Sequence, residues 1–163
     1  MLTISLDTVK SLVNYLTALG IERELLLSTI SLSEQQLNQS NRLLDTSSYE
    51  GLYRLAEQQL GHKTIGFSFG KVIEPDRWGI LGYIVFTSPS LRVALANQRR
   101  FQTLVGDLGT PLQEFTHDTM WLKWIPAYRC SLHTVEDIVT SWAVMASQLS
   151  NTKIEPATIY FTH

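Results

Sequence analysis

The sequence predicts an α+β fold in which N-terminal helices precede a small antiparallel sheet packed with further helices. Two observations support this class. Apolar residues recur at spacings of three and four over much of the chain, which is typical of amphipathic helices. Two β-like runs, 112–115 and 120–125, are separated by His117-Asp118, as in a hairpin. With 163 residues, 44% of them apolar, the chain is long enough for one domain with its own core.

Three helices are expected in the first 40 residues. The apolar positions of 6–19 fall on one helix face, and Gly20 can end this helix in a left-handed turn. A short helix over 22–30 follows, and Ser33 can cap a third helix that runs through Leu37. Helices this short need neighbours to be stable.

A fourth helix is predicted over 47–60. Ser47 and Glu50 have the spacing of a capping box, and Gly61 provides a stop. In the next segment, 65–72, phenylalanines alternate with small residues, which allows either a strand or a short helix. Both alternatives stay open.

Further helices are predicted in the second half of the chain. Residues 79–86 are apolar on every side, and the two glycines of this segment allow another backbone to approach a buried helix closely. Pro89, after a serine cap, is typical of a first helical position and predicts a long helix over 89–105. Beyond the hairpin, an apolar stripe predicts a helix over 132–149. A closing strand is expected at 158–161.

Composition argues against several classes of protein. The chain has 13 Lys and Arg against 15 Asp and Glu, a net charge of −2, which excludes the broad positive field of a DNA-binding surface. No apolar run reaches the ~20 residues that cross a bilayer, and the N-terminus lacks a signal-peptide pattern. The single cysteine, Cys130, cannot form an internal disulfide. We therefore expect a cytoplasmic protein without membrane contact.

Motifs for catalysis or metal binding are missing from the sequence. It contains neither a G-x-S-x-G motif nor a phosphate-binding glycine loop. Cys130 and His133 supply two zinc ligands at most, whereas a site needs three or four. We predict that the protein is not an enzyme and holds no metal or cofactor.

Aromatic side chains offer the best candidates for a binding site, because Trp and Tyr often line small-molecule pockets. Trp78 and Tyr83 lie near the apolar glycine-containing segment, Arg99 lies on the following helix, and Trp124 lies on the hairpin. These four side chains can converge if the helix and the hairpin pack together. The alternative is that the aromatic residues belong to the core and that Arg99 is solvated.

An ordered set of short motifs resembles the N-terminal, arabinose-binding-like sensor domain of AraC/XylS-type transcription regulators. The segments are T-I-G-F-S-F-G from residue 64, W-G-I-L-G-Y from residue 78 and T-S-P-S-L from residue 87, and the last strand resembles the "V-x-F-x-H" strand of the family. The matching residues are Gly66, Gly70, Gly79, Gly82, Tyr83, Ser88, Pro89, Leu91, Ala94 and Leu95. Thr87 and Ser90 replace a serine and a threonine of the pattern.

The resemblance implies one effector-sensing and dimerising domain over 1–163, which regulates transcription in response to a small metabolite. Relatives continue into a further stretch of sensor domain and a C-terminal DNA-binding half with two helix-turn-helix motifs. This chain has neither, so we expect it to be truncated at its C-terminus and to reach DNA only through that missing domain. The low charged fraction, 17%, also favours a homodimer that covers apolar surface.

Two other functions stay open. The chain can instead be an oligomerisation module without a ligand. A small enzyme with unrecognised residues is the least favoured, because no nucleophile and base or metal set is evident.

Overall fold

A computed structural model describes residues 2–39, 42–61, 64–117, 119–150 and 160. Its first elements are β1 (Thr3–Ser5), α1 (Leu6–Ala18), α2 (Arg23–Thr29), α3 (Glu34–Leu37), β2 (Leu43–Asp45) and α4 (Thr46–Leu60). The later elements are α5 (Ile65–Lys71), the 3-10 turn η1 (Pro75–Trp78), α6 (Gly79–Phe86), α7 (Leu91–Phe101), the 3-10 turn η2 (Gln102–Leu104), β3 (Gly109–Phe115), β4 (Met120–Pro126) and α8 (Leu132–Ser150).

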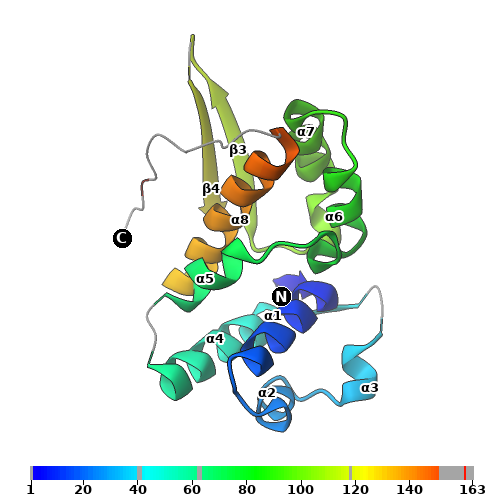
Figure 1. The fold of residues 1–163 in the computed structure, drawn as a ribbon, viewed down its shortest axis with the longest axis vertical. Helices are drawn as coiled ribbons and strands as arrows, with labels where there is room; N and C mark the ends of the chain where they lie inside the picture. The colour runs from blue at the N-terminus through cyan, green and yellow to red at the C-terminus, as the bar shows by residue number, and fades with distance from the viewer. Residues whose placement is uncertain (1, 40–41, 62–63, 118, 151–159, 161–163) are drawn as a thin grey trace.

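The α+β class predicted from the sequence is confirmed. Helices make up most of the structure, and the described strands form two antiparallel pairs, β1 with β2 and β3 with β4. Figure 1 shows α1 to α4 at one end of the molecule and α6, α7 and the β3–β4 hairpin at the other, with α5 and α8 between them. None of the helices in the described part of the chain is long and apolar enough to cross a membrane.

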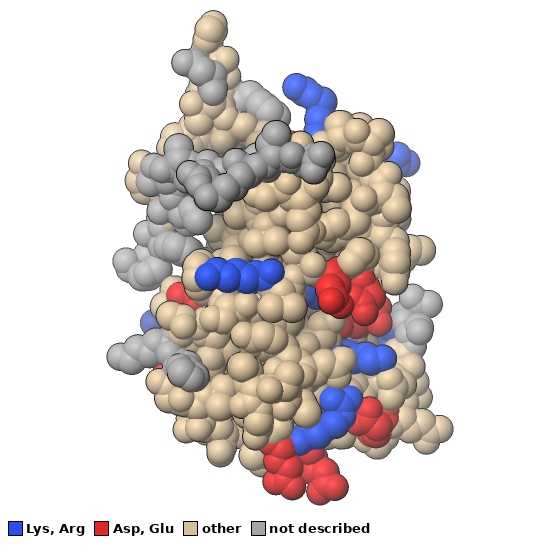
Figure 2. All heavy atoms as spheres, in the orientation of Figure 1, with Lys and Arg blue, Asp and Glu red and all other residues tan. Residues whose placement is uncertain are grey.

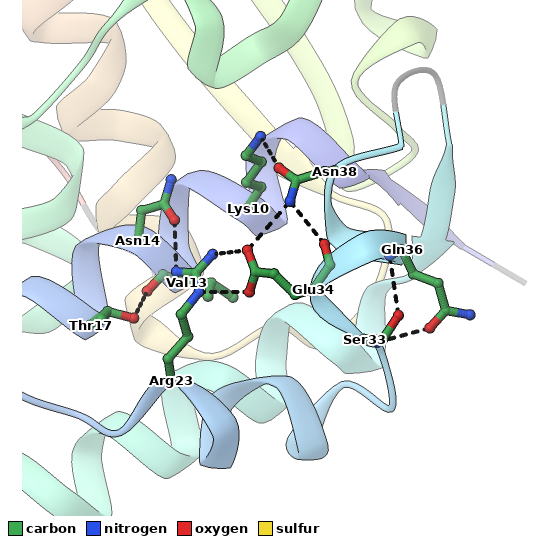
Figure 3. Close-up of polar contacts among 9 residues, drawn as sticks. All are labelled: Lys10, Val13, Asn14, Thr17, Arg23, Ser33, Glu34, Gln36 and Asn38. Atoms are coloured by element: carbon green, nitrogen blue, oxygen red, sulfur yellow. Dashed lines mark hydrogen bonds and ion pairs between the residues drawn. The ribbon is translucent and has the colours of Figure 1, made fainter.

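The three predicted N-terminal helices are present as α1, α2 and α3. Ser33 caps α3 in a full capping box with Gln36, as Figure 3 shows. The same view shows Arg23 paired with Glu34 at 2.8 Å, and Lys10 of α1 donating to Asn38 just after α3. These exposed contacts hold the short α3 against its neighbours.

Three expectations for helices need correction or completion. The cap of α4 is Asp45, whose carboxylate accepts the Ser47 N–H at 2.8 Å, so Ser47 and Glu50 do not form a capping box. Helix α7 is shorter than the predicted 89–105, because Ser90 rather than the residue before Pro89 caps it and the chain tightens into η2 after Phe101. The open segment 65–72 is helical. Of the strand expected at 158–161, Tyr160 is described and belongs to no strand, and the other three positions lie outside the described residues.

Buried apolar side chains form two clusters, one at each end of the molecule. The first cluster comes mainly from α1, α2, α4 and α5, and includes Leu12, Leu16, Leu26, Leu52 and Phe69. The second comes from α6, α7 and α8, and includes Leu81, Val85, Leu95 and Met145. Helices α5 and α8 therefore contribute to different clusters although they pack side by side.

Glycines on one face of α5 allow it to lie directly against α8. A Cβ atom at Gly66 would overlap the backbone carbonyl of His133. A Cβ atom at Gly70 would lie 2.7 Å from the Cβ of Thr140 and 2.8 Å from the carbonyl oxygen of Asp137. Because both glycines face the backbone of α8, the two helices approach more closely than side chains would allow.

Glu50 fixes the beginning of α8 from a distant part of the chain. Its buried carboxylate accepts hydrogen bonds from the hydroxyls of Tyr128 and Thr134, both at 2.8 Å, and from the Ser131 N–H at 3.3 Å. A negative charge near the N-terminal end of a helix also interacts favourably with its dipole. The side chain that looked like part of a cap for α4 thus anchors α8 to α4.

Strand β1 ties the N-terminus to the second half of the chain. The Ser5 N–H donates to the carbonyl of Val105 at 2.6 Å, and the Asp107 N–H donates to the carbonyl of Thr3 at 2.7 Å. Gly106 between them has a φ of +133° and lies against the Thr3 carbonyl, so a side chain there would be both strained and obstructed.

The α5–α8 contact predicts a large difference between two glycine-to-alanine variants. In Gly70→Ala the new methyl group overpacks the contact, and we expect a loss of ~1–2 kcal/mol in the free energy of unfolding after allowing for the helix preference of alanine. Gly51→Ala is the matched control on α4, because its new Cβ meets nothing closer than the Thr29 methyl at 3.5 Å. It should be neutral or stabilising by up to ~1 kcal/mol in urea unfolding. Equal effects of the two substitutions would contradict the close packing.

Candidate functional site

A cavity of about 80 Å³ lies where elements of the two clusters meet. Thr8 of α1 and Tyr49 of α4 line it from one end of the molecule, and Leu81 of α6 and Gln98 of α7 from the other. Trp142 of α8 contributes a further wall. One water molecule needs ~10–15 Å³ of such space, so the cavity has room for several waters or a small organic molecule.

A buried ion pair between Arg77 and Asp137 forms the charged part of the lining. Both side chains are only 3% exposed, and Arg77 Nη2 donates to Asp137 Oδ1. The Tyr49 hydroxyl donates to Asp137 Oδ2 at 2.6 Å, and the Ser141 hydroxyl donates to Oδ1 at 3.2 Å. Burial raises the pKa of Tyr49 well above its usual value, so this hydroxyl stays protonated and keeps its donor role. Asp137 is therefore fully engaged by three donors.

The local chain around η1 positions Arg77 for this pairing. Its Nη1 donates to the carbonyl of Phe69 at 3.1 Å, and its guanidinium carbon lies 3.8 Å from the centre of the Phe69 ring. The Thr8 hydroxyl donates to the backbone carbonyl of Arg77 at 3.2 Å. The buried Nε of Arg77 has no hydrogen-bond partner within the described part of the chain. Arg77 thus connects α1, α5 and α8 around one side of the cavity.

Four side chains of the lining, one glutamine and three tryptophans, have hydrogen-bonding groups without a partner. Gln98 is only 8% exposed, and its amide makes no hydrogen bond to any residue that the structure describes. The indole rings of Trp78, Trp124 and Trp142 also line the cavity, and their N–H groups have no partner in the same described ranges. These groups are not completely buried, so an occupant can bond to them in place of water. The lining atom that is completely buried without a partner is Nε of Arg77, and leaving such an atom unpaired is costly.

Within residues 2–39, 42–61, 64–117 and 119–150, no three His, Cys, Asp or Glu side chains are grouped so as to hold a metal ion. Burial raises the pKa of the Cys130 thiol, so this side chain is not a thiolate at neutral pH. The carboxylate of Asp137 is engaged by its three donors and has no free role as a base.

Two of the four residues proposed from the sequence line the cavity. Trp78 lies at the end of η1 and Trp124 on β4, and both reach the lining. Tyr83 on α6 is 56% exposed and Arg99 on α7 is also exposed, and neither belongs to the lining. A role of any of these four in ligand binding remains a prediction.

Sequence reasoning missed the ion pair itself. Arg77 follows Glu74, Pro75 and Asp76, a run that is typical of a solvated turn. A signal was available for Asp137, because Thr134, Asp137 and Ser141 recur at spacings of three and four within an otherwise apolar helical stripe. Polar residues repeating on a buried face indicate a buried network, but they do not identify its partner.

Comparison with known families gives this cavity a context. Residues 20–163 match the family described as the N-terminal arabinose-binding domain of AraC transcription regulators. The chain belongs to this family. This is a family of regulatory ligand-binding domains and not a family of enzymes. All lining residues named above except Thr8 lie within the matched range. No curated protein matches the chain.

The buried ion pair of this AraC-family domain predicts a strong effect of Asp137→Asn. The substitution leaves the Arg77 guanidinium without its counter-charge in a buried site, and breaking a buried pair at one partner typically costs ~3–5 kcal/mol. We expect a loss of that size in the free energy of unfolding, measured in urea. Tyr49→Phe removes one donor to Asp137 and should cost ~1–3 kcal/mol.

The exposed pair between Arg23 and Glu34 provides the matched control. Its two side chains lie 2.8 Å apart, but that of Glu34 is 54% exposed. Glu34→Gln should leave the urea midpoint close to that of the native domain, because exposed ion pairs contribute little. If Asp137→Asn were as stable as Glu34→Gln, the ion pair would not have the structural role assigned to it.

Proposed function

We propose that the domain binds a small metabolite in the cavity between the two clusters and thereby regulates transcription through a C-terminal DNA-binding domain of an AraC-type regulator. The observation that carries this proposal is the lining: three indole rings and the unpaired amide of Gln98 surround a space next to a buried ion pair. Apolar walls with a few fixed polar groups are typical of ligand pockets. Family membership supports the regulatory role.

The position of the cavity suggests how binding is transmitted. Its walls come from α4, η1, α7 and α8, and therefore from both clusters. If the two ends of the domain change their relative arrangement, a ligand that touches both of them gains or loses contacts. The ligand then favours the arrangement to which it binds more tightly. Helix α8, which carries Asp137 and Trp142, is the element of the lining nearest to the C-terminus.

DNA recognition is assigned to another part of the regulator. On the face shown in Figure 2, Lys and Arg side chains are scattered and form no continuous basic area. With a net charge of −2, the chain lacks the strong positive field that would attract duplex DNA. We therefore propose that 1–163 serves as one sensing and dimerising domain.

A metabolite that fits the cavity should raise the melting temperature, and Trp124→Leu should abolish most of the shift. A ligand at 100 times its dissociation constant adds ~2.7 kcal/mol, which corresponds to about 5–10 °C for a domain of this size. Trp121→Leu on the same strand is the matched control, because Trp121 is 40% exposed and does not line the cavity. The same measurement on Tyr83→Leu and Arg99→Ala tests the two candidates that lie outside the lining.

The alternative function is an oligomerisation module without a ligand. The β3–β4 hairpin is the best candidate for the interface between its copies. Met120, Trp121 and Ile125 of β4 are 36%, 40% and 53% exposed. An isolated two-stranded hairpin is marginally stable, so a second copy packed on it would stabilise it. If a broad panel of sugars, amino acids and aromatic compounds leaves the melting temperature unchanged, this alternative replaces the sensor.

Under either function we propose a homodimer, and its disruption is a separate prediction. Sedimentation at tens of micromolar concentration should show the dimer for the native chain. The double variant Trp121→Lys with Ile125→Lys should shift it to monomer, because charged groups resist burial in an apolar contact. Arg54→Glu, at an exposed position of α4 away from the hairpin, is the control that alters charge without touching these apolar residues. A native chain that sediments as a monomer would contradict the proposal.

A further inference from the structure

We propose that the cavity selects an uncharged, planar, single-ring molecule that carries a carbonyl oxygen or a ring nitrogen, and that it rejects the charged analogues of that molecule. This inference rests on the proposed function, since it names the chemical class that the same site takes.

The charge balance of the lining excludes a charged ligand. Arg77 and Asp137 are the two charged residues in the described lining, and they neutralise each other. Asp137 already accepts from Arg77, Tyr49 and Ser141, so it offers little to a cation. The charge of Arg77 is already balanced by Asp137, and its one unpaired atom, Nε, can donate to a neutral acceptor atom. A charged ligand would therefore lose its hydration in the cavity without gaining an opposite charge.

The unused hydrogen-bonding groups of the lining are mostly donors, so they favour a ligand that carries acceptor atoms. An indole N–H is a donor only, and three indoles line the cavity, those of Trp78, Trp124 and Trp142. The amide of Gln98 adds two N–H groups and one oxygen. Donors thus outnumber acceptors among the groups without partners in the described lining. A neutral carbonyl oxygen or ring nitrogen satisfies such donors without bringing a charge.

The shape of the walls favours a flat molecule of limited size. Aromatic rings pack well against other planar rings, through offset stacking or edge contacts. With a volume of about 80 Å³, the cavity limits a ligand to about one small ring and excludes an extended ligand. An aromatic amide combines all of these properties, whereas the corresponding carboxylate has the same shape and a negative charge.

Two isosteric pairs of probes test the inference, benzamide against benzoate and nicotinamide against nicotinate. The protein has four tryptophans, and Trp121 is the one that does not line the cavity. In the Trp121→Phe variant, all of the indole fluorescence therefore comes from cavity residues. We expect a saturable change in emission and a rise in melting temperature with at least one amide, and binding at least about tenfold weaker for its carboxylate.

A glutamine pair provides the matched variants. Gln98→Met keeps the size of the side chain but removes its amide, and it should weaken binding of the amide probe by about tenfold or more. Gln59→Met makes the same replacement at an exposed position of α4 and should leave binding unchanged. Melting of both variants without ligand shows first that each one is folded.

The outcomes separate this inference from the proposed function. If a carboxylate binds as tightly as its amide, or if Gln98→Met has no effect on amide binding, the chemical class is wrong while a ligand-binding cavity stands. If neither amide binds but a charged metabolite from the broad panel does, the class is again overturned and the sensor function stands. If no compound binds, both the chemical class and the proposed sensor function are contradicted.

Discussion

The buried pair of Arg77 and Asp137 is the contact on which the middle of this domain depends. Neither charge reaches solvent, so the pair is tolerable only because Tyr49 and Ser141 supply further donors and the ring of Phe69 lies under the guanidinium. These partners come from α4, α8 and α5, while Arg77 itself lies in η1. One ion pair therefore fixes four elements from three separate parts of the sequence.

The same pair determines what remains available in the cavity. Because the two charges neutralise each other, the groups left for an occupant are the indoles, the amide of Gln98 and the unpaired Nε–H of Arg77. Because η1 and α8 carry the ion pair and also line the cavity, a ligand has to fit the arrangement of these two elements in which the ion pair is formed. The binding proposed for this cavity would thus be coupled to the contact that joins the two halves of the domain.

Local patterns predicted most of the elements but only part of the site. The amphipathic helices and the hairpin are visible in the sequence because their signal is periodic, and the aromatic character of Trp78 and Trp124 indicated the lining. Helix α5 was ambiguous, because it packs through glycines and therefore shows no apolar stripe. The role of Arg77 could not be predicted, since its partner lies 60 positions further along the chain and nothing local distinguishes it from a solvated arginine.

The glycine face of α5 also limits how the domain can move. Gly66 and Gly70 are one helical turn apart, and they meet the backbone at His133 and Asp137, which are one turn apart on α8. Two such contacts lock the register of the pair, because sliding α8 along its axis would push backbone atoms of one helix into those of the other. The two helices therefore form one unit. Any rearrangement of the cavity wall around Asp137 has to carry α5 along with α8.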